Sequence, residues 1–128
     1  MSPDLAYLVW TLALCFVQML VAVAGAAGQV GLATLASNRE NMPALTGWVD
    51  RAQRAHRNMI ENLILFAPLV LLAVAAGRTN AITALGAQIF FYGRLAYAVV
   101  FIAGIPWLRT AVWTVSVVGL LLIFFQLV

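Results

Sequence analysis

The chain has 128 residues, of which 65% are hydrophobic and only 9% are charged, whereas a soluble domain carries roughly 25% charged residues. This composition excludes an ordinary water-soluble domain. Seven arginines, no lysine and four acidic residues give a net charge of +3. Nucleic acid is a poor partner, because several arginines lie inside or beside apolar segments and cannot form an exposed basic stripe.

Four apolar segments dominate the chain, at residues 5–35, 57–77, 81–105 and 109–128. Each can cross a bilayer as a helix, which takes about 20 apolar residues. The first is much longer than the apolar core of a signal peptide, so we expect it to remain as a span. The second and third links are short, which makes consecutive helices antiparallel neighbours. The sequence therefore predicts one all-α domain, residues 1–128, folded as a four-helix bundle in a membrane.

Small residues lie close together in the first span. Residues 24–28 are all alanine or glycine, and Gly31 follows. Such residues let membrane helices approach closely, either within the bundle or between copies of the chain. The one cysteine, Cys15, is expected to be a small buried hydrophobic residue. A single cysteine excludes an intramolecular disulfide and a cysteine metal cluster, and no metal site is predicted.

A polar stripe enters the second span. Arg54, Asn58 and Glu61 are spaced i, i+4 and i+7, which places them on one face of a helix. Arg51 extends this face by one turn toward the interface, and the stripe is expected to end at Glu61, shortly inside the hydrocarbon. A polar face at membrane depth needs a polar partner.

The third span contributes Arg94, Tyr97 and Phe101, spaced i, i+3 and i+7, with Arg94 near the middle. An arginine at that depth costs about 2.5–3.5 kcal/mol even on a lenient scale, so it should face the bundle and be paired. Glu61 is the one acidic residue expected at membrane depth, so we predict a contact between Arg94 and Glu61. This pair could be purely structural or part of a binding site.

The arginines are distributed unevenly between the two sides of the predicted bundle. The first and third links lie on one side, and both termini and the second link lie on the other, which carries only Arg78. Cytoplasmic loops are enriched in arginine, so we expect the long link at 36–57 to be cytoplasmic and both termini to be outside or lumenal, in a bacterial inner membrane. The arginines on the expected cytoplasmic side are Arg39, Arg51, Arg54, Arg57 and Arg109.

These side chains suggest the chemistry of a ligand. Arginine matches carboxylates bidentately, Glu61 would accept an ammonium group, and Asn58 and Tyr97 would bind amides or hydroxyls. A small acidic peptide with a free amino terminus meets these demands better than a sugar or a lipid.

Two motifs carry a resemblance to a known family. Arg51-Ala-Gln-Arg-Ala-His-Arg-Asn-Met-Ile-Glu-Asn62 contains an Arg-x-x-x-Asn-x-x-Glu pattern, and Arg94-Leu-Ala-Tyr97 is followed by Gly104-Ile-Pro-Trp-Leu-Arg109. With the four-span layout, these motifs resemble the MAPEG family, the membrane-associated proteins in eicosanoid and glutathione metabolism, which include microsomal glutathione transferases. The resemblance implies a homotrimer that binds glutathione between neighbouring subunits near the cytoplasmic face.

The resemblance also implies a catalytic residue. Arg109 would hold the glutathione sulfur as thiolate, because a nearby guanidinium favours the anion of a thiol. Arg109 could instead be an interfacial charge that only sets topology. The residues predicted to bind glutathione, as co-substrate, lie in the two motifs: Arg51, Arg54, Asn58, Glu61, Arg94 and Tyr97.

Three positions depart from the family pattern or lie outside the predicted site. Phe101 stands where some members have tyrosine, so one hydroxyl contact is missing. Ile64 stands where many members have proline, which should leave the second span straighter. His56 is expected on a different helix face from Arg54 and Asn58, solvated or at the interface.

The resemblance favours a membrane-bound glutathione-dependent transferase or peroxidase that acts on a hydrophobic electrophile or a lipid hydroperoxide from the bilayer. Another small thiol could replace glutathione. The alternative is a non-catalytic lipid-binding or scaffold protein of the same fold, which would not need a thiolate site. A transporter is disfavoured, because neither an internal repeat nor broken mid-membrane helices are evident.

Overall fold

The computed structural model describes all 128 residues. Its helices are α1 (Pro3–Val30), α2 (Leu32–Ala36), α3 (Gly47–Ala75), α4 (Ala81–Ala103) and α5 (Pro106–Leu127). All except α2 are long and apolar enough to cross a membrane. These observations confirm the predicted all-α class with four long apolar helices.

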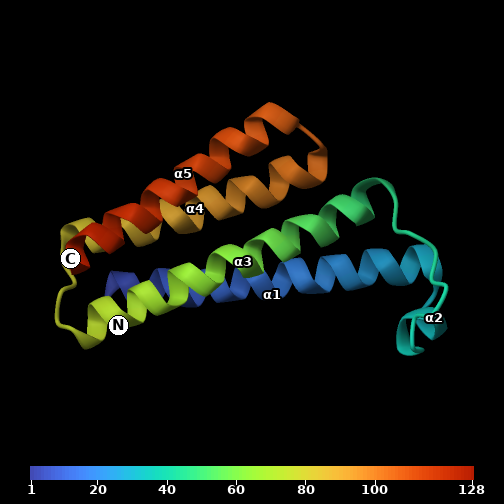
Figure 1. The fold of residues 1–128 in the computed structure, drawn as a ribbon, viewed down its shortest axis with the longest axis horizontal. Helices are drawn as coiled ribbons and strands as arrows, with labels where there is room; N and C mark the ends of the chain where they lie inside the picture. The colour runs from blue at the N-terminus through green and yellow to red at the C-terminus, as the bar shows by residue number, and fades with distance from the viewer.

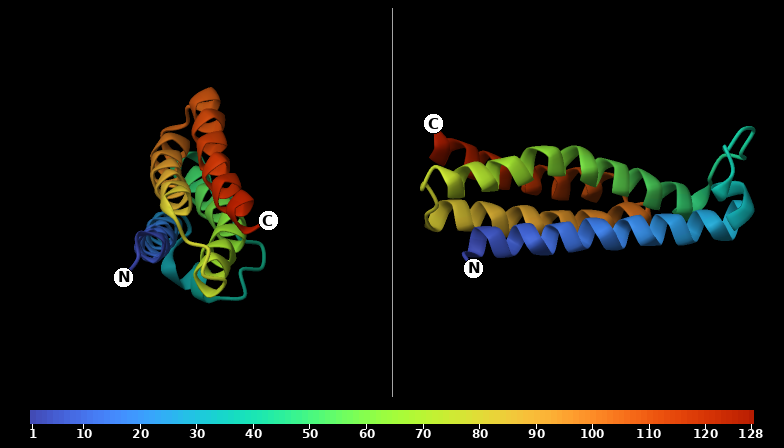
Figure 2. Two further views of the ribbon diagram at one scale, coloured as in Figure 1. Left: turned by 90° about the vertical axis from the view of Figure 1, so that its left-hand side faces the viewer. Right: turned by 90° about the horizontal axis from the view of Figure 1, so that it is seen from below.

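The four long helices run side by side and alternate in direction (Figure 1). Both termini and the α3–α4 link lie at one end, here called the terminal end (residues 1–6, 76–82 and 124–128). The α2 helix and the α4–α5 turn lie toward the other end, here called the loop end (residues 31–54 and 102–109). Helices α4 and α5 form the most extensively packed pair, whereas the backbones of α1 and α5 do not come close together. Seen end-on, α3 and α4 separate α1 from α5 (Figure 2).

The first predicted span, 5–35, is wrong in one respect, because its helix ends at Val30. Gly31 has a φ of 87°, which residues with a side chain rarely adopt, and the chain turns there into the short α2. At its start, α1 is capped by Ser2, whose hydroxyl accepts a hydrogen bond from the Leu5 amide at 3.4 Å. Gly31 therefore separates the long membrane helix from the loop end.

Helix α3 begins at Gly47, well before the predicted span at 57–77. The prediction followed the apolar run, but the first turns of α3 are polar on one side only. On the other side Val49, Ala52 and Ala55 are buried. The whole polar stripe therefore belongs to one continuous helix.

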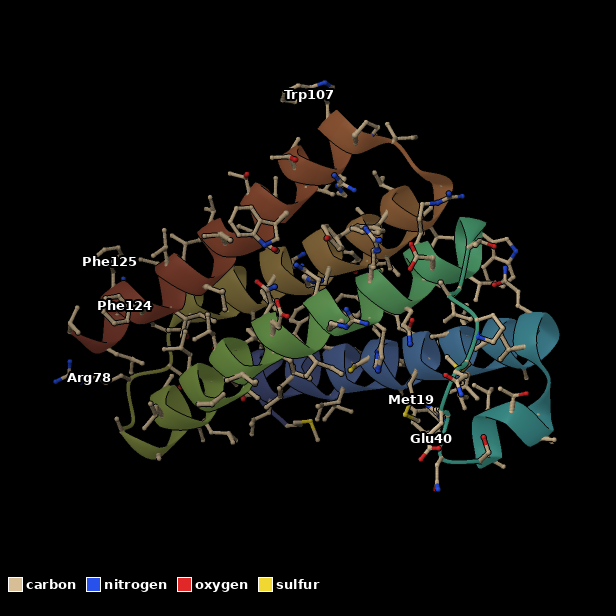
Figure 3. All side chains as sticks on the ribbon, turned by 45° about the vertical axis from the view of Figure 1, so that its right-hand side comes forward. Met19, Glu40, Arg78, Trp107, Phe124 and Phe125 are labelled. Carbon is tan, nitrogen blue, oxygen red and sulfur yellow. The ribbon has the colours of Figure 1, made fainter.

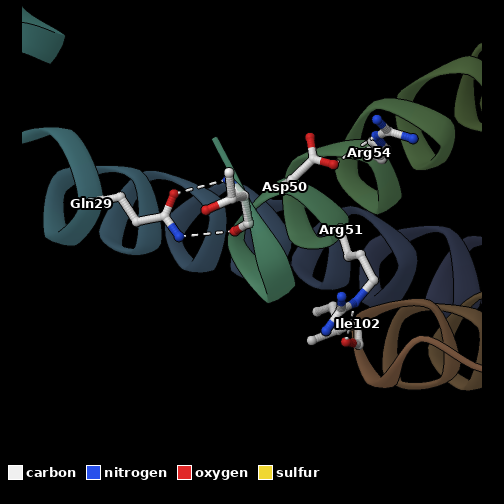
Figure 4. Close-up of polar contacts among 6 residues, drawn as sticks. Gln29, Asp50, Arg51, Arg54 and Ile102 are labelled. Carbon is white, nitrogen blue, oxygen red and sulfur yellow. Dashed lines mark hydrogen bonds and ion pairs between the residues drawn. The ribbon is translucent and has the colours of Figure 1, made fainter. Parts of the chain in front are cut away.

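The small residues of α1 serve packing within the chain only in part. A Cβ atom at Gly25 would lie 2.9 Å from the Trp48 ring, so the absence of a side chain at Gly25 helps the start of α3 to pack closely against α1. Gly28 has open space around it, and its predicted packing role is not seen within one chain. Next to it, Gln29 holds the start of α3, donating to the Thr46 carbonyl at 2.9 Å and accepting from the Thr46 amide at 3.1 Å (Figure 4).

The closest helix contact joins α4 to α5 along a line of small residues, here called the glycine seam (Gly86, Gly93, Ser116 and Gly119). A Cβ atom at Gly119 would lie 2.5 Å from the Gly86 carbonyl oxygen, and one at Gly93 would lie 3.1 Å from Ser116. Small residues at such crossings let membrane helices gain van der Waals contact. Sequence reasoning placed this device in α1 and missed it here.

Two groups of contacts close the terminal half of the bundle. The rings of Phe66 and Phe90 stack with centroids 4.0 Å apart inside the main apolar core. At the terminal end, the Asn80 side chain caps α4 and donates to Gln126 at 2.9 Å. Arg78, at the edge of this end (Figure 3), donates from Nη1 to the Leu127 carbonyl at 3.1 Å. The other core residues are Leu8, Val70, Ala73, Ala87, Leu120 and Ile123.

Candidate functional site

A small pocket lies where α3, α4 and α5 meet, on the loop-end side of the core. Asn58 from α3, Tyr97 from α4 and Arg109 from α5 line it, together with Thr110 and Trp113, and its volume is about 180 Å³. The fold thus brings together three predicted site residues that are distant in the chain. This site is called the Asn58–Tyr97–Arg109 pocket below.

The position of Arg109 is set by the tight turn between α4 and α5. Gly104 ends α4 with a φ of 82°, and Pro106 begins α5, where its missing amide hydrogen costs nothing. The Arg109 guanidinium lies over the Phe101 ring, 4.8 Å from its centroid, in a cation–π contact. Phe101 therefore holds Arg109 in place, although it lacks the hydroxyl of a tyrosine.

Arg94 is the largest fully buried side chain, with 1% of its surface exposed. Its guanidinium lies 4.2 Å from the centroid of the Tyr97 ring, and none of its three nitrogen atoms has a hydrogen-bond partner. Tyr97 itself is buried and lines the pocket. A buried charge without a partner is strongly destabilising. A hydrogen-bond acceptor placed beside this pocket would therefore stabilise the protein.

The predicted contact between Arg94 and Glu61 is wrong for the single chain. Glu61 is exposed, and the one ion pair in the chain joins Asp50 to Arg54. The core-facing side of α3 passes through Met59, which is fully buried. Glu61 follows it by two positions, which turns its side chain about 200° around the helix and away from the core.

Arg51 and Arg54 are both engaged within the chain (Figure 4). Arg51 Nε donates to the Ile102 carbonyl at 2.9 Å, at the end of α4, where carbonyls lack helical partners. Arg54 Nε lies 3.0 Å from Asp50 Oδ2, and the Arg54 side chain is 64% exposed. An exposed pair is weak, so Arg54 can exchange Asp50 for another carboxylate, whereas Arg51 also joins α3 to α4.

Asn58 is oriented by a residue that sequence reasoning missed. Asn62 Nδ2 donates to the Asn58 carbonyl at 2.8 Å and to Asn58 Oδ1 at 3.1 Å, which leaves the Asn58 Nδ2 donor for a ligand. The i+4 spacing from Asn58 was the available signal, because it continues the polar stripe beyond Glu61. Thr110 and Trp113 gave no such signal, since the sequence does not say which face of α5 meets the pocket.

A larger apolar pocket, of about 530 Å³, runs beside the first between α3 and α5. It shares Trp113 with the Asn58–Tyr97–Arg109 pocket and is otherwise lined by Asn62 and aliphatic or aromatic residues such as Leu65 and Phe124. His56 lines neither pocket and lies on a different side of α3 from Asn58, as predicted.

The fold and the pocket define a helical multi-pass membrane protein with a polar site embedded among its apolar helices. The model of the MAPEG family matches residues 5–128, nearly the whole chain, and the chain belongs to this family. The family includes glutathione-dependent enzymes and also non-catalytic members. No curated protein and no solved structure matches the chain.

Proposed function

We propose that the chain is a membrane-bound, glutathione-dependent transferase or peroxidase that activates the glutathione thiol in the Asn58–Tyr97–Arg109 pocket. Arg94 carries the proposal, because its three unpaired guanidinium nitrogens lie beside this pocket. A bound anion would satisfy them through charge-assisted hydrogen bonds, which are about twice as strong as neutral ones. Family membership supports this choice of ligand.

Glutathione fits the polar groups by type. Its two carboxylates suit Arg54 and Arg94, and its amides suit Asn58 and Tyr97. Its ammonium group suits Glu61, whose carboxylate is exposed and has no cationic partner in the chain. Arg51 has two terminal nitrogens beyond its bond to Ile102 and would contribute through them.

The pocket of one chain is too small for a tripeptide. A cavity of about 150 Å³ holds a molecule the size of benzene, and the volume here is about 180 Å³. Arg54 and Glu61 lie outside it, exposed on the same side of α3. We therefore propose that a neighbouring copy completes the site in a homotrimer, as is known for this family.

Arg109 would act on the reacting sulfur. A free thiol has a pKa of about 8.5, and a fixed guanidinium favours the thiolate, which is the nucleophile. In the transferase reaction the thiolate forms a carbon–sulfur bond while the electrophile loses a leaving group or gains a proton. In the peroxidase reaction two glutathione molecules become the disulfide while the hydroperoxide yields an alcohol and water.

The apolar pocket between α3 and α5 is the proposed place for the hydrophobic electrophile or lipid hydroperoxide. It shares Trp113 with the Asn58–Tyr97–Arg109 pocket, so a substrate lying there would have one end near the thiolate. Leu65, Leu121 and Phe124 line this pocket and are exposed on the single chain, so a lipid-soluble substrate can enter from the bilayer.

The loop end is the proposed cytoplasmic side. Arg39, Arg51 and Arg109 lie there, while Arg78 is alone at the terminal end, so the positive-inside rule places the loop end in the cytoplasm. Both termini would then be outside, in a bacterial inner membrane.

The test of the proposed function is thiolate formation in the detergent-purified protein, measured as the ultraviolet absorbance of the thiolate when glutathione is added. We expect the band in the unaltered protein and its loss in Arg109→Ala. Turnover with a generic aryl halide should fall about 100-fold or more, as when a donor to a developing anion is removed.

Arg78→Ala is the matched control, because it removes the same charge at the other end of the bundle, and it should leave both signals unchanged. If Arg109→Ala keeps the band, Arg109 is only a topology charge. If the unaltered protein neither binds nor ionises glutathione, the chain is a lipid-binding or scaffold member of its family.

A further inference from the structure

A second cavity lies at the loop end, between α1, α2, the loop at 37–46 and the start of α3. Its volume is about 420 Å³, within the roughly 300–1,000 Å³ range of small-molecule sites. It shares no residue with the Asn58–Tyr97–Arg109 pocket. Helix α3 separates the two, since Gln53 and His56 line this cavity and Asn58 lines the other. It is called the α1–α2 cavity below.

Most residues that line the α1–α2 cavity are hydrophobic, and one wall of the cavity is formed by the membrane helix α1. Met19 and Ala26 come from α1, while Leu35 and Ala36 come from α2. Figure 3 shows Met19 projecting from α1 toward the loop that carries residue 40. An apolar chain lying against α1 here would be continuous with the bilayer.

The three polar lining residues are all hydrogen-bond donors, and none is acidic. Arg39 uses Nε to bind the Leu35 carbonyl at 2.9 Å, which leaves its two terminal nitrogens, and it has no carboxylate partner. His56 Nδ1 is buried without a hydrogen-bond partner. The third is Gln53, whose side-chain amide can also donate. These side chains place one positive charge and several hydrogen-bond donors at one side of an otherwise apolar cavity.

We propose that the α1–α2 cavity binds one long-chain fatty acid, with its carboxylate at Arg39, Gln53 and His56 and its chain along α1. A cavity of about 150 Å³ holds one benzene-sized group, so about 420 Å³ holds roughly three, the size of a single acyl chain with its head group. One arginine fork and two neutral donors match a singly charged carboxylate. A phosphate, with a charge of about −1.5 to −2, would leave charge unbalanced.

This proposal does not depend on the proposed glutathione chemistry, because the two sites share no residue. Its test uses the full-length protein in phosphatidylcholine nanodiscs and palmitic acid carrying a photoreactive group on its chain. Crosslinked peptides are identified by mass spectrometry. We expect saturable labelling of residues in α1, α2 and the 37–46 loop, and little labelling by the matching alcohol.

Two variants with matched controls decide the result. Ala36→Phe, which fills the cavity, should abolish the saturable labelling, whereas Ala33→Phe, on the same helix but outside the cavity, should not. Arg39→Gln should raise the half-saturating concentration about tenfold, the loss of one charge-assisted hydrogen bond, while Arg39→Lys retains most of the binding. Thermal unfolding of each variant shows that it remains folded.

Three labelling results would overturn the proposal. They are labelling spread evenly over the lipid-facing helices, equal labelling by acid and alcohol, and equal effects of Ala36→Phe and Ala33→Phe. Displacement of the probe by lysophosphatidic acid at a lower concentration than by palmitate would also overturn it, because the cavity would then select a phosphate.

Discussion

Toward the terminal end, α4 and α5 lie so close that the Gly86 carbonyl fills the space a Gly119 side chain would need. At that end Asn80, Gln126 and Arg78 are hydrogen-bonded. Toward the loop end α5 diverges from α3 (Figure 1), and the buried Arg94 guanidinium has no hydrogen-bond partner. In the first region close packing of α4 on α5 and these side-chain hydrogen bonds favour stability, although one oxygen of the buried Asp4 carboxylate has no hydrogen-bond partner. In the second region the unpaired Arg94 guanidinium costs stability, a cost that the proposed ligand would offset.

The largest expected effect is on the glycine seam. Gly119→Leu would force α4 and α5 apart, because even a Cβ atom would lie 2.5 Å from a backbone oxygen. We expect a loss of at least about 3 kcal/mol, the upper range for overpacking, measured as thermal unfolding by circular dichroism in detergent. Gly28→Leu, which meets open space, is the control. Equal melting temperatures for the two variants would show that the seam is not a close-packed interface.

The next largest effect is expected at Arg94, where a substitution should raise the stability of the ligand-free protein rather than lower it. Arg94→Met removes an unpaired buried charge and keeps most of the side-chain volume, so the ligand-free protein should become more stable by about 2 kcal/mol. Glutathione affinity, measured by calorimetry, should fall. A variant that loses stability without ligand would show that Arg94 has a structural partner. Glu61→Gln should leave stability nearly unchanged, because Glu61 does not pair with Arg94.

The smallest effect is expected at the terminal end, where a substitution should change stability but not glutathione binding. Asn80→Ala removes the α4 cap and the bond to Gln126, and a lost N-cap costs about 1 kcal/mol. The melting temperature should fall slightly, while glutathione binding stays unchanged, since Asn80 is at the end away from the pocket. A change in binding would show that the two ends of the bundle are energetically coupled.

The sequence by itself determined the class of protein and most of the candidate site. Long apolar runs predicted the four helices, because a bilayer requires about 20 apolar residues per span. The i, i+4 and i+7 spacing predicted which polar residues share a face of α3. Local signals of this kind depend only on helix geometry and composition.

Only the tertiary structure decided which faces meet. Helix ends depended on Gly31 and on the buried start of α3, which an apolar-run criterion does not detect. The glycine seam could not be predicted without knowing that Gly86 and Gly119 lie opposite each other. The sequence also predicted a contact between Glu61 and Arg94. It indicates how deep each residue lies in the membrane but not how each helix is rotated about its axis. The rotation of α3, set by burial of Met59 and Phe66, turns Glu61 outward and leaves Arg94 unpaired.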